Sequence, residues 1–332
     1  MAIYDNKRLV IKACKLFYED NMSQKDISLS LGISKPQVCR MLNFAKENHI
    51  VEFTINNPYS QEFELEEKLV EKYSLKEAFV FNFSYQTTDE AISKLGECCA
   101  EQLDKYFTDN SIIGVMSGRT IASISDFAHK LTREGLTFVP LVGNIGSGGH
   151  KWHANSIAEN FAHKTGGDYN LMNSPIILQN QETCNLIKKE PSILQILAKG
   201  KACNIALIGI GEINLSSTSY LCGAFSENDI TKLIAQNAVA SVCTSYISKD
   251  GKILDTELNL RSIGISLNEL AKSTTIAVST GMEKLEATKA VLKSGYIDIF
   301  MTSRNIAEEL LNWKDLIPFK ILILMLLYIH SF

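Results

Sequence analysis

The chain has 332 residues, of which 45% are hydrophobic and 21% are charged. This is the composition of a soluble globular protein with room for one small and one large domain. The net charge of −4 argues against a protein that coats nucleic acid non-specifically. The opening residues MAIYDNKRLV lack the apolar core of a signal peptide, so we expect a cytoplasmic protein.

The eight cysteines are scattered through the chain and form no CxxC pair. Cysteine and histidine do not cluster at metal-ligand spacing, so we expect reduced, mostly buried thiols and neither a metal nor a cofactor. Charge is spread unevenly: residues 1–57 hold 8 Lys and Arg against 6 Asp and Glu, and the remainder holds 25 against 31. A slightly basic head on an acidic body is typical of a protein whose head alone contacts DNA.

Three helices are predicted in the head, residues 1–57. Apolar residues at helical spacing indicate the first helix over 8–18, and Ser23 is the expected N-cap of a second helix that ends near Leu31. Gly32 can adopt the positive φ of a sharp turn. Ser34 is the expected N-cap of the third helix. Pro36 lies in its first turn, where backbone N–H groups have no partner within the helix, so the missing N–H of proline costs no hydrogen bond.

The third helix has the pattern of a recognition helix. Its buried stripe is expected to comprise Val38, Met41, Leu42 and Ala45. The opposite, polar side holds the candidate DNA-binding residues Ser34, Lys35, Gln37, Arg40, Asn43 and Lys46. A helix, a turn with glycine and a second helix with a polar start predict a helix-turn-helix, although any three-helix module could show this pattern. The alternation in 50–56 predicts a short strand, forming a small wing.

The body is expected to begin after a connecting segment. Residues 58–75, with the charged amphipathic stretch QEFELEEKLVEKYS, predict a linker or packing helix. In 76–332, apolar runs at 77–83, 111–117, 136–142, 204–211, 274–280 and 297–303 alternate with helical stretches. This alternation predicts an α/β domain with a mostly parallel, doubly wound sheet that is covered on both faces.

Ligands of such sheets bind at the carboxyl ends of the strands, where three loops are candidate binding sites. GVMSGRT (114–120) places Arg119 and Thr120 at a helix start, where backbone amides attract phosphate. STGMEK (279–284) places Lys284 at a second such start, and LVGNIGSGGH (141–150) is rich in glycine. Each loop alone is a weak signal. We expect the nearby histidines at 150, 153 and 163 to be solvated or structural.

The combined motifs resemble one family. The head segment LSLGISKPQVCRMLNFAKENHIVEFTI is similar to the DNA-binding module of the SorC family of bacterial sugar-responsive transcription regulators. The body continues the resemblance, in order, through GVMSGRT, VPLVGNIGS, NSIAENFAHKTGGDYNLMNSPIIL, ALIGIGE, LRSIGISLNEL and GMEKLEATKAVLKSGYIDIFMTS. It implies a body that resembles sugar-phosphate isomerases and deaminases in fold and binds a phosphorylated sugar. It also implies a homo-oligomer, a dimer or tetramer.

The resemblance also implies an effector site. Ser117, Gly118, Arg119 and Thr120 would hold the phosphate, Gly281 and Lys284 would close the site, and Arg261 would lie near the effector. Two family carboxylates are absent, because Ser241 and Ser303 occupy their positions. Their loss removes acceptors for sugar hydroxyls. An unusual effector, a weakened site and a regulator that no longer responds all remain open.

Two functions are compatible with these features. The first is a regulator that binds double-stranded operator DNA and is controlled by a phosphorylated sugar. The second is an enzyme acting on a sugar phosphate, which needs a general base near the phosphate loop. The missing carboxylates favour the regulator, so we expect no catalytic residues. The apolar tail FKILILMLLYIHSF (319–332) is too short for a bilayer span of about 20 residues. We therefore expect a buried helix or subunit contact rather than a membrane anchor, although a reading-frame change would also produce such a tail.

Overall fold

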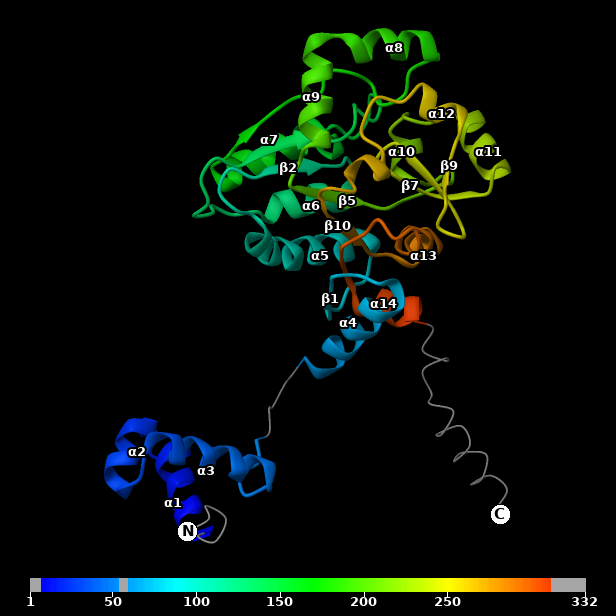
Figure 1. Ribbon diagram of the computed structural model, residues 1–332. Coiled ribbons are helices and arrows are strands. Elements are labelled where there is room, and N and C mark those ends of the chain that lie inside the picture. Colours follow the sequence, from blue (N-terminus) through cyan, green and yellow to red (C-terminus); the bar gives the residue numbers. More distant parts are fainter. Residues whose placement is uncertain (1–6, 54–58, 312–332) are drawn as a thin grey trace, which may run out of the picture. The chain divides into compact units, whose positions relative to one another are not determined.

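The computed structural model describes residues 7–53 and 59–311. By its internal contacts the chain divides into a smaller unit, Met1–Pro58, and a larger unit, Tyr59–Phe332 (Figure 1). Each unit has its own buried core, and each is described separately below. Within the described residues, no helix is long and apolar enough to cross a membrane.

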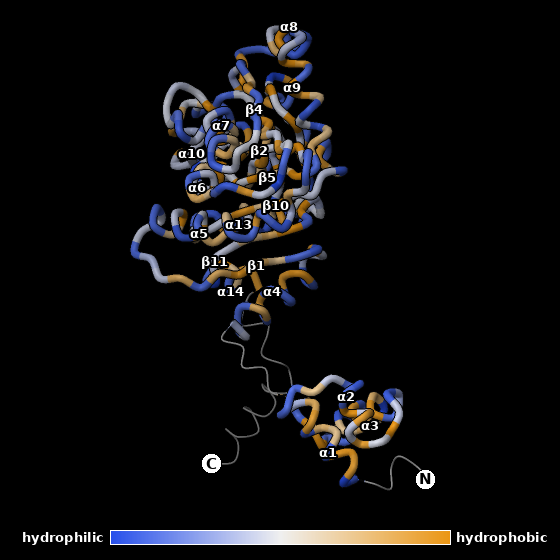
Figure 2. Tube along the Cα trace, turned by 90° about the vertical axis from the view of Figure 1, so that its left-hand side faces the viewer, coloured by the Kyte–Doolittle hydropathy of each residue, from blue (hydrophilic) through white to orange (hydrophobic). Residues whose placement is uncertain are grey.

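The smaller unit consists of three helices. They are α1 (Lys7–Tyr18), α2 (Gln24–Leu31) and α3 (Lys35–Glu47). The predicted stripe of α3 is buried, together with Val10 and Ala13 of α1 and Ile27 of α2. The apolar positions of the three helices thus meet in one core, as the orange segments of Figure 2 show. The three predicted helices are confirmed.

Local signals explain where these helices begin and end. Ser23 is the N-cap of α2 and accepts a hydrogen bond from the backbone N–H of Asp26 at 3.2 Å. Gly32 ends α2 with a φ of 65°, a left-handed conformation that glycine adopts without a Cβ clash. Ser34 is the N-cap of α3, and its backbone N–H donates to the side-chain oxygen of Gln37 at 2.9 Å. This return contact stabilises the start of the helix.

The predicted wing strand is wrong over residues 50–53. Residues 50–53 form no strand, and 54–56 lie outside the described residues. The chain instead turns back at the end of α3, where the N–H groups of Ile50 and Val51 both donate to the carbonyl of Ala45. Both side chains pack against the three-helix core. Bonds to the helix end and contacts with the core therefore replace an extended strand here.

The larger unit is built on a seven-stranded sheet in the order β1-β11-β10-β5-β2-β3-β4. All six strand pairs are parallel. The strands are β1 (Glu77–Phe81), β2 (Ile112–Val115), β3 (Thr137–Pro140), β4 (Asp168–Tyr169), β5 (Ile205–Gly209), β10 (Thr274–Ser279) and β11 (Ile299–Ser303). The predicted parallel sheet is confirmed.

Helices cover both faces of this sheet because successive strand residues point to opposite sides. In β5, Ile205 and Leu207 pack with α5 (Thr88–Leu103), α6 (Arg119–Phe127) and α7 (Ala154–Thr165). Ala206 and Ile208 belong to the opposite core, which is covered by α4 (Ser60–Tyr73), α9 (Pro191–Lys201), α13 (Leu285–Lys293) and α14 (Arg304–Leu311). The helix α8 (Gln181–Lys189) precedes α9 and projects away from the sheet in Figure 1.

The helix α4 occupies most of the segment for which a linker helix was predicted. Leu65, Leu69 and Tyr73 of α4 are buried in the core of the larger unit. The Tyr73 hydroxyl donates to the carbonyl of Leu310 in α14 at 3.1 Å, and the two helices lie side by side (Figure 1). The helix therefore packs as part of the body.

A second sheet was not predicted from the sequence. It is antiparallel, in the order β6-β7-β8-β9. Its strands are β6 (Gly211–Glu212), β7 (Ala238–Val242), β8 (Ser245–Ser248) and β9 (Ile253–Leu254), accompanied by α10 (Thr218–Leu221), α11 (Glu227–Ala235) and α12 (Glu257–Leu260). The run 204–211 was interpreted as one strand, but β5 ends at Gly209 and the chain then enters the second sheet.

Short 3-10 helices complete the unit: η2 (Asp104–Tyr106), η3 (His150–Trp152), η4 (Leu267–Leu270) and η5 (Met282–Lys284). All eight cysteines are free thiols; Cys39 is exposed, Cys98 is half-buried and the other six are buried. The expectation of mostly buried thiols is confirmed.

Candidate functional sites

A pocket lies beyond the carboxyl ends of β2, β5 and β10. It is a hollow of about 460 Å³, including space open to solvent. Four stretches far apart in the sequence form it: the turn into α6, the loop that contains Ile145, the segment from the end of β5 to the start of α10, and η5. Its lining comprises Met116, Ser117, Gly118, Arg119, Thr120, Ile121, Ile145, Gly209, Ile210, Gly211, Glu212, Ser217, Thr218, Ser219 and Lys284. This is where a parallel α/β sheet binds its ligands.

The start of α6 supplies hydrogen-bond donors to this pocket. Gly118 has a φ of 136° and a ψ of 159°, and the helix begins at the next residue. The N–H of Gly118 itself donates to the carbonyl of Trp152 at 2.9 Å, so it is already occupied. Among the described residues, no side chain caps α6. Its first-turn amides, with the buried hydroxyls of Ser117 and Thr120, are therefore suited to an anion.

Arg119 adds a cation at the same point. Its guanidinium forms an ion pair with Asp89 of α5 and lies 5.6 Å from the ring centre of Trp152. The Asp89 side chain is 79% exposed, and such surface ion pairs contribute little to stability. An anionic ligand can therefore compete with Asp89 for the guanidinium.

The opposite side of the pocket contains an acid that the sequence analysis missed. Lys284 Nζ lies 4.0 Å from Glu212 Oε2, and the two side chains are only 15% and 13% exposed. Glu212 lies three residues beyond the end of the parallel strand β5, in the motif IGIGE, and is the second residue of β6. The other two loops were chosen because they follow the carboxyl ends of parallel strands. The same criterion, applied to the end of β5, would also have found this glutamate.

Gly281 positions Lys284 but does not line the pocket. It follows β10 with a φ of 99°, and its carbonyl accepts a hydrogen bond from the N–H of Lys284 at 3.1 Å. The glycine-rich loop 141–150 contributes only Ile145 to the described lining. His153, the residue before α7, places its Nε2 3.0 Å from the carbonyl oxygen of Gly148 in that loop.

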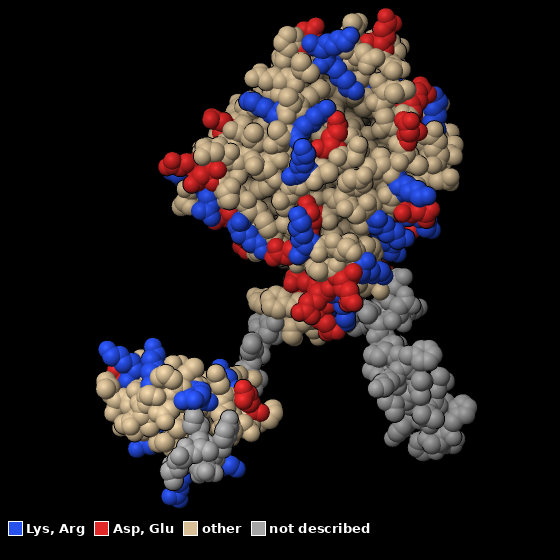
Figure 3. Space-filling view, in the orientation of Figure 1, with Lys and Arg blue, Asp and Glu red and all other residues tan. Residues whose placement is uncertain are grey.

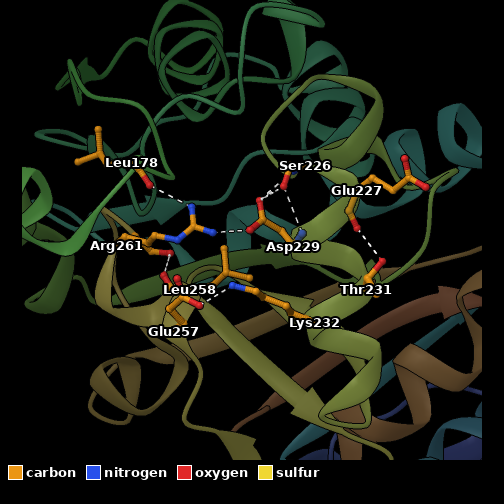
Figure 4. A network of polar contacts seen from close by, with 10 residues as sticks. Leu178, Ser226, Glu227, Asp229, Thr231, Lys232, Glu257, Leu258 and Arg261 are labelled. Atoms are coloured by element: carbon orange, nitrogen blue, oxygen red, sulfur yellow. Dashed lines mark hydrogen bonds and ion pairs between the residues drawn. The ribbon is translucent and has the colours of Figure 1, made fainter.

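Arg261 is not brought to this pocket, contrary to the expectation. Its Nη1 donates to the carbonyl of Leu178 at 3.0 Å, and its Nη2 forms an ion pair with Asp229 of α11 (Figure 4). Asp229 also accepts hydrogen bonds from the backbone N–H of Ser226 at 2.9 Å and from its hydroxyl at 2.7 Å. Arg261 is thus committed to joining the end of α12 to α11.

These contacts determine the ionisation of Asp229. Burial by itself would raise the pKa of the carboxyl group. The hydrogen bonds from Ser226 and the charge of Arg261 outweigh burial, so the pKa of Asp229 lies below its ordinary value. The network therefore holds a carboxylate against a guanidinium, which is a structural role.

The two serines that were expected at family carboxylate positions have different surroundings. Ser303 and Thr280 share a hydrogen bond of 2.8 Å, and the Thr302 hydroxyl donates to the carbonyl of Ser279 at 2.7 Å. All of these side chains are buried and none lines the pocket. Ser241 lies closer: its Oγ is 2.6 Å from the position that a Cβ of Gly211 would occupy.

In the smaller unit, the polar residues of α3 lie on the side away from its core. Ser34, Lys35, Arg40, Asn43 and Lys46 are exposed. Gln37 is half-buried, and its side-chain oxygen accepts hydrogen bonds from the backbone N–H and the hydroxyl of Ser34. Lys46 Nζ lies 5.5 Å from the ring centre of Phe53. Figure 3 shows Lys and Arg side chains on the visible face of the smaller unit, whereas acidic side chains gather over α4.

Comparison with known proteins identifies the class of the chain. The family model "Putative sugar-binding domain" matches residues 57–312. The chain belongs to this family of sugar-binding domains.

Individual relatives match over nearly the whole chain. The deoxyribonucleoside regulator of Bacillus subtilis is 28% identical over 93% of this chain and 98% of its own length. The sorbitol operon regulator of Klebsiella pneumoniae is 26% identical over 93% of this chain and 99% of its own. The crystal structure of the full-length Klebsiella regulator, SorC, superposes with a TM-score of 0.71 over 92% of this chain and 98% of that one. The resemblance to the SorC family is confirmed.

Proposed function

We propose that this protein is a cytoplasmic transcriptional regulator that binds operator DNA through α3 and responds to a phosphorylated sugar bound in the pocket of the larger unit. The observation that carries the proposal is the match to named regulators of sugar and nucleoside operons over both units of the chain. A sugar-binding module alone would match over the larger unit only.

The geometry of the smaller unit supports DNA binding by a helix-turn-helix. The helices α2 and α3 are joined by a short turn through Gly32, and α3 begins with an exposed polar surface. Such a helix enters the major groove with its first residues toward the base edges. Lys35, Gln37 and Arg40 would reach the bases, and Asn43 and Lys46 the phosphate backbone. The side-chain oxygen of Gln37 is engaged with Ser34, so its amide NH₂ would contact a base.

The chemistry of the pocket supports a phosphorylated ligand. The start of α6 offers amide donors beside Arg119, and the hydroxyls of Ser117 and Thr120 are buried at the same point. Charge-assisted hydrogen bonds of this kind contribute about 1.5–3 kcal/mol each. We therefore expect Arg119→Ala or Lys284→Ala to weaken the binding of a phosphosugar about tenfold or more.

One observation favours a catalytic alternative. An isomerase or deaminase needs a general base within reach of the sugar carbons, and Glu212 is an acid in the lining of the pocket. A turnover assay against pentose and hexose phosphates separates the two functions, because sustained product formation occurs only with an enzyme.

The regulator is tested by selection of DNA and by ligand response. The full-length protein is used to enrich duplexes from a random pool, and affinity for the selected duplex is measured with a panel of phosphorylated sugars and their unphosphorylated parents. We expect one enriched sequence motif and a change in affinity with at least one phosphosugar but not with its parent. Failure to enrich any motif would contradict DNA recognition. Equal effects of sugar and phosphosugar would contradict the assigned pocket chemistry.

A further inference from the structure

The two sides of the pocket differ in charge. The α6 side presents amides, hydroxyls and Arg119. Among the described residues of the lining, Glu212 is the one acidic side chain, and it lies beside Lys284. We propose, on the basis of the proposed function, that Glu212 accepts hydrogen bonds from sugar hydroxyls and selects singly phosphorylated over doubly phosphorylated sugars.

The sheet order places Glu212 and Lys284 away from the phosphate-binding side. The helix α6 follows β2, which pairs with β5, and β5 pairs with β10. Glu212 follows β5 and Lys284 follows β10, one and two strands from β2. Neighbouring strands lie about 4.8 Å apart, so β2, which leads into α6, and β10, which leads to Lys284, are about 10 Å apart. A sugar with its phosphate at α6 would extend its hydroxyls toward this pair.

The spacing of the pair suits a hydroxyl group. Lys284 Nζ and Glu212 Oε2 are 4.0 Å apart, at the outer limit of an ion pair. A hydroxyl oxygen about 2.8 Å from each atom fits between them, accepting from the ammonium and donating to the carboxylate. A phosphate group near neutral pH has mainly acceptor oxygens and negative charge. Its oxygens could accept from the Lys284 ammonium, but they have no hydrogen to donate to Glu212 and would meet this carboxylate with like charge.

The second sheet holds Glu212 in this position. Its backbone belongs to β6, in which Gly211 pairs with Ser241 and Glu212 with Ala240 of β7. Ser241 Oγ lies 2.6 Å from the position that a Cβ of Gly211 would occupy, so the Ser241 side chain covers β6 at this residue. The carboxylate is thus placed by an antiparallel pairing rather than by a free loop, as a specificity-determining side chain requires.

The test uses ligand pairs that differ only by a second phosphate. Titration calorimetry on the full-length protein compares fructose 6-phosphate with fructose 1,6-bisphosphate, and glucose 6-phosphate with glucose 1,6-bisphosphate, with inorganic phosphate as a probe of the anchor. We expect the monophosphate to be preferred at least tenfold in one pair, because each tenfold ratio needs only about 1.4 kcal/mol of repulsion. In Glu212→Gln, which keeps the shape but removes the charge, this preference should fall at least tenfold while inorganic phosphate binds as before.

Glu227→Gln is the matched control, since Glu227 is an exposed acid of α11 outside the pocket lining. It should leave every affinity unchanged. An unchanged monophosphate preference in Glu212→Gln, or a bisphosphate preference in the unaltered protein, would overturn the role of Glu212 and leave the phosphosugar function intact. Failure of all phosphorylated probes and inorganic phosphate to bind would overturn both.

Discussion

The surroundings of individual cations decide what each can do in this protein. Arg261 is 14% exposed and forms an ion pair with Asp229, which is 6% exposed, so its charge is neutralised within the fold. Arg119 pairs with an acid that is 79% exposed and can exchange that partner for a ligand. Both arginines lie within motifs on which the predicted family resemblance rests, GVMSGRT and LRSIGISLNEL, and the burial of their partners separates the structural residue from the candidate binding residue.

Asp229→Asn should destabilise the larger unit by about 3 kcal/mol at pH 7, because the buried guanidinium of Arg261 loses its countercharge. The pKa of Asp229 is lowered by folding, so its contribution is present above the unfolded-state pKa of about 3.9 and is lost as the pH falls through the lower folded value. Urea unfolding at pH values from 7 to 3 measures how the free energy of unfolding depends on pH. The variant should show a weaker loss of stability with acid. Glu257→Gln, which removes the exposed partner of Lys232, is the control and should change little.

Arg40→Ala should reduce affinity for the selected operator by about 1–3 kcal/mol and relax specificity at one base pair. Arg40 is exposed on the polar side of α3, whereas Met41 and Leu42, which follow it in the chain, are buried in the core. Lys46→Ala should instead weaken binding to all sequences about equally, since Lys46 is expected at the phosphate backbone. Fluorescence anisotropy on matched and single-base-changed duplexes distinguishes these effects. An Arg40→Ala protein with unchanged affinity and preference would mean that another surface reads the bases.

At the scale of elements, helix ends contribute both to folding and to the candidate binding site. Ser23, Gly32 and Ser34 define the boundaries of α2 and α3 through their own backbone and side-chain contacts. The start of α6 is different, because its amides have no capping side chain in the described structure and open into a pocket. An uncapped helix start beside a cation is suited to a ligand that completes the missing bonds.

Gly118→Ala should therefore impair binding more than folding. Its φ of 136° and ψ of 159° lie in a region essentially reserved for glycine, and the space around a new Cβ is open. An alanine would rotate this backbone and misalign the first amides of α6. Gly166→Ala is the matched control, because Gly166 has a φ of 85° and equally open surroundings at the end of α7.

Both substitutions should cost about 1–3 kcal/mol of stability. Only Gly118→Ala should also lower affinity for a phosphosugar at least tenfold in calorimetry. Equal phosphosugar affinities in the two variants would show that the conformation at residue 118 has no part in binding.

At the scale of the whole molecule, we expect at least a dimer. One recognition helix contacts only a few base pairs, and helix-turn-helix proteins gain affinity by pairing heads on two half-sites. Light scattering coupled to size-exclusion chromatography at micromolar concentration measures the mass directly, against the 36.9 kDa of one chain. A monomer that still binds its operator at the same concentration would contradict this expectation.

The sequence by itself determined the features that depend on local periodicity and on neighbouring residues. Helix caps at Ser23 and Ser34, the stripe of α3 and the apolar runs of the parallel strands all act over a few residues, so their patterns are visible in the chain. The loop GVMSGRT and Lys284 were also found in this way, and the structure brings both to one pocket. The same local view failed at 50–53, where bonds to the end of α3 override an alternating pattern.

Only the tertiary structure decided which distant residues meet. The strands of the second sheet are two to five residues long and pair across turns and helices, so they leave little periodic signal. That sheet holds Glu212 beside Lys284, 72 positions later in the chain, and the packing of α11 against α12 commits Arg261 to Asp229. The sequence specifies the charge and chemistry of a side chain, but long-range packing sets its partner. That partner determines whether the side chain stabilises the fold or is available to a ligand.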